Sequence, residues 1–281
     1  MKRINRTFSV APMMDWTDRH CRYLHRLISK NVLLYTEMVT APALIHGDAD
    51  RLLEFNQSEH PIALQIGGSH PNQLAQATRL GCEAGYDEIN INIGCPSDRV
   101  QFGRFGACLM KEPELVSECV TAMKEASTGA EITVKCRIGV DDQEPKRILP
   151  DFIDKVSQNG VSSFTIHARK AWLSGLSPKQ NRDVPPLDYE LVHEIKKERP
   201  ELEIILNGGL QTFDQAVHEI NKGLDGAMIG RTAYHNPMEI LANADSLFET
   251  NTNKKSVNKI IDEMLPYIQN HLDTGGRLNQ I

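Results

Sequence analysis

The feature that most constrains the fold is a repeated alternation of short apolar runs and helical segments over the first 231 residues. Eight runs rich in β-branched or other apolar residues occur, at residues 8–10, 33–38, 62–66, 88–93, 132–136, 164–167, 204–206 and 227–229. Several are apolar without strict alternation, which is typical of strands buried on both faces of a parallel sheet. Eight successive strand–helix units predict an α/β fold, a parallel (β/α)8 TIM barrel.

The segments between these runs support the prediction. Residues 71–84 and 112–126 carry apolar side chains at three- and four-residue spacing, and each segment opens with a proline near its start. Beyond Arg231 the strand pattern stops, and a helical apolar stripe runs from Val257 to Leu272. We expect Pro266 to kink or interrupt that helix, and the glycines at 275 and 276 to end it. The predicted division is a barrel domain, 1–235, and a small helical domain, 236–281.

Composition excludes several classes of protein. No apolar run is long enough to cross a bilayer or to act as a signal peptide, so we expect a cytoplasmic protein with no membrane partner. The six cysteines lack metal-ligand spacing, which predicts reduced thiols and no metal site. A net charge of −6 argues against a uniformly basic surface, so an RNA partner would need a local basic patch. No protein partner is required, and the expectation is a monomer.

Distinctive residues fall at or just after the carboxyl ends of the predicted strands, where the loops of a barrel build its active site. In chain order they are Pro12, Met13, Met14, Gln65, Asn92, Cys95, Lys135, His167, Arg169, Asn207, Gly208, Gly209, Gly230 and Arg231. Any single polar residue among them is as readily explained as a structural hydrogen-bonding group. Their joint placement in a ring favours a functional site.

Two glycine-containing segments after the last two strands indicate a phosphate-bearing ligand. LNGG and IGR place flexible backbone amides where they can close around a phosphate, and Arg231 adds a planar cationic donor. Each glycine taken alone is equally well an ordinary turn residue. Lys135, at the barrel mouth, is suited to stabilise an electron-rich flavin or a developing anion, although alone it reads better as a lysine extending from a strand end into water.

Cys95 differs from the other cysteines because it lies in a Gly-Cys-Pro turn of a polar loop just past the fourth strand. An unperturbed thiol is mostly protonated at neutral pH, which suits a general acid. If Lys135 or Arg99 lowered its pKa, the thiolate would instead be a nucleophile, and the sequence leaves both roles open.

The motifs together resemble those of the bacterial tRNA-dihydrouridine synthases. They are APMMDWTDRHCR, YTEMVTAPALIHGD, ALQIGGS, NINIGCPSDRVQFGRFGACLMK, VKCRIG, HARKAWLSGLSPKQNRDVPPLDY, LNGG and DGAMIGRTAYHNP. The longest two resemble the A branch, which implies action on uridines 20 and 20a of the tRNA D-loop. The resemblance implies a TIM barrel holding FMN, with NADPH (NADH is possible) reducing the flavin, hydride passing to C6 of uracil and Cys95 giving a proton to C5.

The resemblance also implies roles residue by residue. Pro12, Met13 and Met14 line the flavin, Gln65, Lys135 and His167 hydrogen-bond it, and Asn207 to Gly209 with Gly230 and Arg231 hold its phosphate. Asn92 resembles an asparagine at the uracil pocket, and Lys179 and Arg182 resemble residues that contact tRNA. Arg169, Lys170, Lys179 and Arg182 do lie together on one loop of an acidic chain, as phosphate contacts require. The resemblance also implies a carboxyl-terminal helical domain that grips tRNA, and we expect residues 236–281 to be an incomplete form of it.

Two other functions stay open at this point. A different FMN barrel reductase, acting on a free small molecule, would share the phosphate site but would not need Lys179 and Arg182. A phosphate-binding protein or lyase without redox chemistry would be colourless after purification.

Overall fold

The computed structural model describes residues 4–97, 102–248 and 254–281, so Arg99 lies outside the described residues. Eight strands form one parallel sheet: β1 (Phe8–Val10), β2 (Leu34–Thr40), β3 (Ile62–Gly67), β4 (Glu88–Ile93), β5 (Glu131–Arg137), β6 (Ser163–His167), β7 (Glu203–Asn207) and β8 (Gly226–Ile229). The strands pair in the order β1-β8-β7-β6-β5-β4-β3-β2. Between β1 and β2, Val10 N donates to Leu33 O at 3.0 Å and Leu33 N donates to Phe8 O at 3.1 Å. The sheet therefore closes, and the predicted (β/α)8 barrel is confirmed.

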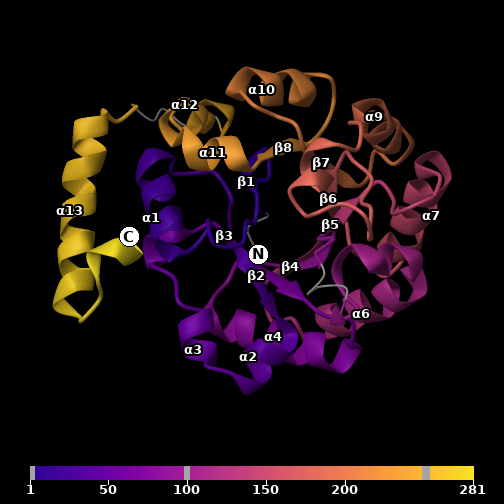
Figure 1. Cartoon of the computed structure of the whole chain (residues 1–281), viewed down its shortest axis with the longest axis horizontal. Helices are drawn as coiled ribbons and strands as arrows, with labels where there is room; N and C mark the ends of the chain where they lie inside the picture. Colours follow the sequence, from indigo (N-terminus) through magenta and orange to yellow (C-terminus); the bar gives the residue numbers. More distant parts are fainter. Residues whose placement is uncertain (1–3, 98–101, 249–253) are drawn as a thin grey trace.

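Helices surround the barrel (Figure 1). They are α1 (Arg19–Ile28), α2 (Ala41–His46), α3 (Ala49–Leu52), α4 (Pro71–Ala84), α6 (Pro113–Ala126), α7 (Pro145–Ser157), α8 (Gln180–Asp183), α9 (Tyr189–Glu198), α10 (Phe213–Asn221), α11 (Arg231–His235), α12 (Pro237–Leu241) and α13 (Val257–Asp273), with short 3-10 turns η1 (Gln57–Glu59), η2 (Gly106–Lys111), η3 (Ala244–Phe248) and η4 (Leu278–Gln280). The helices predicted at 71–84 and 112–126 are confirmed as α4 and α6. The predicted strands differ from the observed ones by no more than two residues at either end.

The main core lies between the strands and the surrounding helices, and α4 shows how the sequence builds it. Pro71 opens this helix, and Gly85 ends it in a left-handed conformation with φ 95°. Leu74 and Ala77 are fully buried against the sheet. A Cβ on Gly81 would come within 2.8 Å of Leu64 and closer still to Ile89, so a glycine is what lets the helix lie this near the strands. A smaller apolar cluster occupies the barrel interior.

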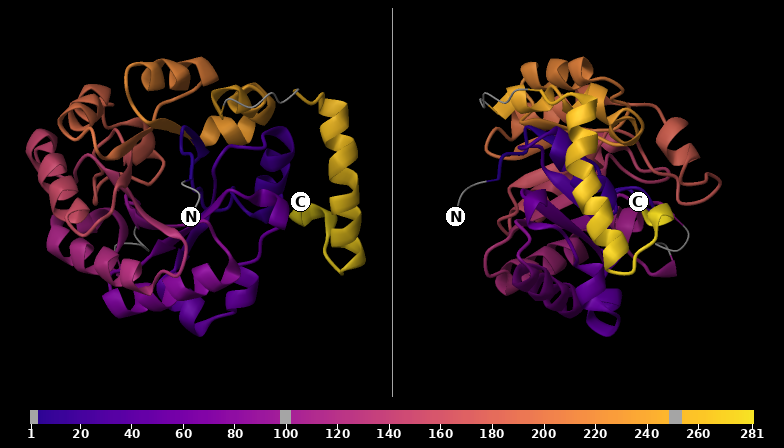
Figure 2. Two further views of the ribbon diagram at one scale, coloured as in Figure 1. Left: turned by 180° about the vertical axis from the view of Figure 1, so that it is seen from behind. Right: turned by 90° about the vertical axis from the view of Figure 1, so that its left-hand side faces the viewer.

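The last long helix, α13, lies alongside α1 (Figures 1 and 2). Ile260 and Met264 are buried, and the ring of Tyr267 stacks on Tyr23 with centroids 4.0 Å apart. Of the two outcomes expected at Pro266, an interruption was wrong, because α13 runs through it from Val257 to Asp273, and a kink stays a prediction. Packing on α1 stabilises a helix that the proline alone would weaken.

The end of α13 follows the prediction. Gly275 is left-handed with φ 90°, its amide donates to Leu272 O, and the Gly276 amide donates to His271 O. This is the hydrogen-bond pattern of a Schellman C-cap.

The proposed domain boundary between 235 and 236 stays a prediction. Within the described part of the chain, no helix combines the length and apolar character needed to cross a membrane.

Candidate active site

The strand register brings the predicted polar residues together at the carboxyl end of the barrel. Asn92 of β4 is the register partner of Lys135 of β5, and His167 of β6 is the partner of Asn207 of β7. The Lys135 ammonium donates to Asn207 Oδ1 at 2.9 Å, and Asn207 Nδ2 donates to Met228 O at 2.8 Å. Residues from five strands therefore share one hydrogen-bonded surface.

A chain of buried hydrogen bonds runs from this surface into the barrel. Asn92 Nδ2 donates to Gln65 Oε1, Gln65 Nε2 to Asn90 Oδ1, and Asn90 Nδ2 to Thr133 Oγ1, each at 2.8 Å. Thr133 Oγ1 donates in turn to Glu88 at 2.5 Å. Each amide has its orientation set by the next residue in this chain. The directions of the polar atoms of Gln65 and Asn92 are therefore fixed by Asn90, Thr133 and Glu88.

The hydrogen-bond chain ends at Glu88, which is held by a buried arginine. Arg6 donates to Glu88 at 2.7 Å, to Glu131 at 2.7 Å and to Glu203 at 2.9 Å. The Arg6 guanidinium and the three carboxylates compensate the cost of burying one another's charge. The burial also raises the pKa of the Tyr35 hydroxyl, which donates to Glu88 at 2.5 Å.

Asn92 also shapes the turn that carries Cys95. Its Oδ1 accepts hydrogen bonds from Gly94 N at 3.0 Å and Cys95 N at 2.9 Å, and Ala107 N donates to Cys95 O at 2.9 Å. The thiol lies 3.6 Å from Ser97 Oγ and is partly buried. The predicted position of Cys95, on a loop at the barrel mouth, is thus confirmed, and the thiol is held there by its backbone.

The surroundings of Cys95 are cationic although the whole chain is acidic. The side chains of Lys135, Arg137 and Arg182 lie close enough to Cys95 that a thiolate there would raise the pKa of each. Burial, with a contribution from Arg137, lowers the pKa of Lys135 to about 8. Burial and the same cations hold the pKa of His167 well below its usual range, so its imidazole is neutral at physiological pH. The site is therefore suited to an anionic ligand.

Arg137 is a central residue that sequence reasoning missed. It is 3% exposed, and burial lowers its pKa to about 10. Its guanidinium donates to Gly94 O at 3.1 Å, Lys170 O at 3.2 Å and Asn181 O at 2.9 Å. The signal in VKCRIG was its spacing, since Arg137 follows Lys135 by two residues and shares its side of the strand. It joins the Cys95 loop to the loop after β6.

The glycines after β7 lie in conformations that favour glycine, with φ 103° at Gly208 and 73° at Gly209. A Cβ on Gly208 would fall 2.4 Å from His167 Cδ2, so the backbone passes directly against the imidazole. Met13 lies near Gly230, because a Cβ there would be 3.5 Å from Met13 Sδ. The ends of β1, β7 and β8 thus meet as predicted. Pro12 is partly buried beside Met13, whereas Met14 is 53% exposed.

The charged loop residues have distinct surroundings. Arg231 is paired with Asp183 of α8 at 2.7 Å, which holds the pKa of that carboxyl below its usual range. Arg169 donates through one terminal nitrogen to Pro185 O, while its Nε is buried with no hydrogen-bond partner among the described residues. Lys179 and Arg182 are exposed on and beside α8. The structure places all four on the side of the barrel that carries Cys95.

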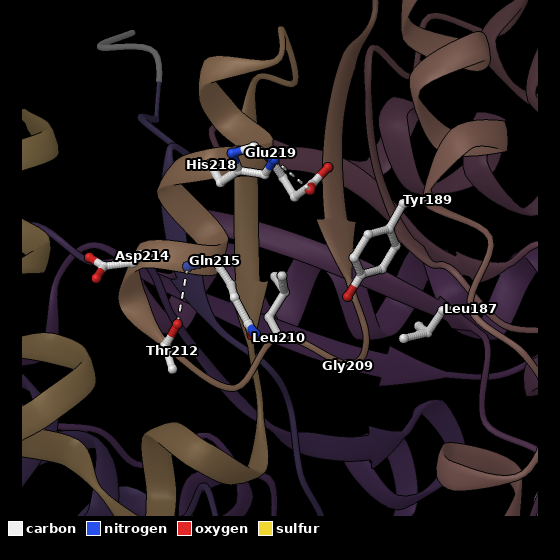
Figure 3. A pocket seen from close by; sticks show the side chains of 9 residues that line it. All are labelled: Leu187, Tyr189, Gly209, Leu210, Thr212, Asp214, Gln215, His218 and Glu219. Carbon is white, nitrogen blue, oxygen red and sulfur yellow. Dashed lines mark hydrogen bonds and ion pairs between the residues drawn. The ribbon is translucent and has the colours of Figure 1, made fainter.

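A hollow lies beside the glycine turn that follows β7 (Figure 3). Its lining comes from the start of α9 and the residues just before it, from the turn after β7, and from α10: Leu187, Tyr189, Gly209, Leu210, Thr212, Asp214, Gln215, His218 and Glu219. Only Gly209 among them belongs to the predicted site. Tyr189 donates to Gly208 O at 2.6 Å, so this region supports the turn from outside. In the described residues, no group of His, Cys, Asp and Glu side chains is arranged to hold a metal ion.

Comparison with known proteins gives consistent matches along the chain. The family model described as "Dihydrouridine synthase (Dus)" matches residues 9–281. A protein of Shewanella oneidensis named tRNA-dihydrouridine(20/20a) synthase is 56% identical over 281 residues, covering 100% of this chain and 83% of the relative. Relatives with the same name from Vibrio cholerae (56% over 275 residues, 97% and 83% covered) and Yersinia pestis (53% over 276 residues, 98% and 79%) match almost as far.

Proposed function

Since the chain belongs to the dihydrouridine synthase family, we propose that it reduces the C5=C6 bond of uracil at positions 20 and 20a of tRNA, using FMN and NADPH. The observation that carries the proposal is the position of Cys95 within a ring of cationic and amide side chains at the barrel mouth. The matching names of relatives at 51–56% identity support the choice of substrate.

The residues present fit FMN. The left-handed turn at Gly208 and Gly209 has no room for a side chain at Gly208, as expected where a backbone must approach a ligand closely. Arg169 Nε, which is buried without a hydrogen-bond partner among the described residues, and the guanidinium of Arg231, which also pairs with Asp183, supply donors for a phosphate. Gln65, Lys135 and His167 are placed to hydrogen-bond the ring system. When bound, FMN supplies the hydride that uracil C6 receives, and NADPH, or NADH, is its source.

In this proposal Cys95 donates the proton that uracil C5 receives, and its thiolate is left behind. Lys135, Arg137 and Arg182 stabilise that negative charge, because all three cations lie within electrostatic range of a Cys95 thiolate. Asn92 holds the backbone of the turn through Gly94 N and Cys95 N. Each of the Asn92 and Gln65 amide nitrogens keeps a second N–H, whose direction is fixed by the bonds that the amide already makes, and such a donor suits recognition of a uracil carbonyl.

The target uridine is stacked within folded tRNA, so the enzyme must extract it into the pocket. Lys179 and Arg182 are exposed on the segment between β6 and α9, at the same end of the barrel as Cys95. We propose that they bind tRNA phosphates. Replacing either residue by Ala should weaken tRNA binding and reduce the slope of log Kd against log salt by about one. Loss of bound FMN in both variants would show that the loop had been assigned to the wrong ligand.

The test of the function is the visible spectrum of the purified protein with NADPH and then with unmodified tRNA, under anaerobic conditions. The expected result is a flavin spectrum that NADPH bleaches and tRNA restores, with dihydrouridine at positions 20 and 20a by mass spectrometry. A flavin that free uridine reoxidises as well as tRNA does would support a small-molecule reductase instead. A protein that takes up no flavin would overturn the proposal.

A further inference from the structure

Trp172 presents an aromatic ring to solvent beside the candidate site. It lies between β6 and α8 and is 37% exposed, although tryptophan is usually buried in large part. Another exposed aromatic residue, Tyr234, is explained by stacking on Trp16 with centroids 4.7 Å apart. The ring of Trp172 instead contacts a cation, since Lys170 Nζ lies 5.3 Å from the ring centroid. The part of the ring that Lys170 does not cover is open to solvent and available to a ligand.

The backbone at Trp172 is held firmly, so the exposure is not that of a loose loop. Trp172 N donates to Asn181 Oδ1 at 2.7 Å, and Asn181 Nδ2 donates to Trp172 O at 2.9 Å. Asn181 is fully buried. The next residue, Leu173, donates through its amide to Asp141 Oδ1 at 2.8 Å, and Asp141 is paired with Lys111 at 2.6 Å. The backbone that carries the ring is therefore fixed, which reduces the ordering that a ligand must impose.

The same loop is fixed relative to Cys95. Arg137 donates to Gly94 O, which precedes Cys95, and to the carbonyls of Lys170 and Asn181, which flank and clamp Trp172. One buried guanidinium thus sets the position of the aromatic ring with respect to the thiol. A ligand that contacts both receives a defined spacing between them.

The chemistry around Trp172 matches a nucleic acid. Lys170 covers part of the ring surface, and Lys179 and Arg182 are exposed on the same loop, in a chain of net charge −6. An aromatic ring among cations is the arrangement that binds single-stranded nucleic acid, where a base stacks and the cations contact phosphates. A protein partner would be expected to bring a larger apolar surface than one ring.

We propose that Trp172 is a stacking platform for a tRNA base adjacent to the extracted uridine. This inference rests on the proposed function, and it adds a residue that recognises the unpaired strand rather than the reacting ring. Stacking of the neighbouring base on Trp172 compensates part of the base stacking that is lost when the uridine is extracted from the folded tRNA. Lys170 then lies near the backbone of the stacked nucleotide.

The test compares Trp172→Phe with Trp172→Leu in the FMN-bound protein, measuring Kd for unmodified tRNA over a range of salt concentrations. Both side chains fill space, but only Phe stacks. Leu should raise Kd by about five- to 150-fold, the range for loss of one stacked base, whereas Phe should stay within about fivefold of wild type. The slope of log Kd against log salt should be the same in all three proteins, because no charge is removed. Flavin content is the control for folding.

A second readout uses the two tryptophans of the chain, Trp16 and Trp172. In Trp16→Phe the emission comes from Trp172 alone, and binding of tRNA should quench it. In Trp172→Phe the emission of Trp16 should change little. Equal Kd for Trp172→Leu and wild type, with no quenching, would overturn the inference. If wild type itself neither binds nor reduces tRNA, the proposed function fails as well, so the two failures are distinguishable.

Discussion

Replacing Arg137 by Met tests whether one buried guanidinium organises the site. Met has similar length but cannot donate the hydrogen bonds to Gly94 O, Lys170 O and Asn181 O. A hydrogen bond from a charged donor contributes about 1.5–3 kcal/mol. Burial of the charge opposes this, since a pKa lowered to about 10 corresponds to roughly 3 kcal/mol. For three such bonds, less the cost of burial, the net expectation is a loss of about 1.5–6 kcal/mol of unfolding free energy.

The assay is urea denaturation of the FMN-bound protein, with dihydrouridine formation measured in parallel. The matched control is Arg51→Met, because the Arg51 side chain is 74% exposed and its removal should change the free energy by less than about 0.5 kcal/mol. Activity should fall in Arg137→Met, since Gly94 loses its anchor beside Cys95. An unfolding free energy for Arg137→Met as close to wild type as that of the control would refute the reasoning. Full rescue by Arg137→Lys would show that charge alone, and not the three-way geometry, is needed.

Three further predictions concern the chemistry. Cys95→Ala should leave FMN bound and reducible by NADPH while largely removing dihydrouridine formation, and unchanged activity on tRNA would exclude Cys95 as the acid. The folded-state pKa of Lys135, about 8, lies below its ordinary value of 10.5, so the unfolded chain binds more protons between these values and wild-type stability rises with pH there. Flavin-free Lys135→Met should thus be about 1–2 kcal/mol more stable than wild type at pH 7, a difference that urea titrations should show shrinking toward pH 10.5. Gly208→Ala should displace His167 and lower FMN content, whereas Gly85→Ala, equally left-handed but with open space around its Cβ, should cost only about 1–2 kcal/mol of backbone strain and retain FMN.

The strands and the position of the site were predictable because both are local or topological properties. Apolar runs of strand length mark each strand, and eight parallel strands place their carboxyl ends at one mouth. Gln65, Lys135, His167 and Asn207 could therefore be expected to converge without any distance being known.

Other features depended on tertiary structure. Arg137 could be a solvated cation at a strand end or a buried residue that connects two loops. Which of these it is depends on the carbonyls that the loops bring to it, and two of these carbonyls lie 33 and 44 residues away in the sequence. Pro266 is compatible with a continuous α13 because packing on α1 stabilises the helix, and local helix propensity does not include this tertiary contribution. Asn92 and Gln65 were recognisable as polar strand residues, but their orientation is set by a chain of hydrogen bonds ending at Arg6. Periodicity along the chain determines which residues face the barrel, whereas only the folded arrangement determines which of them share hydrogen bonds and which remain available to a ligand.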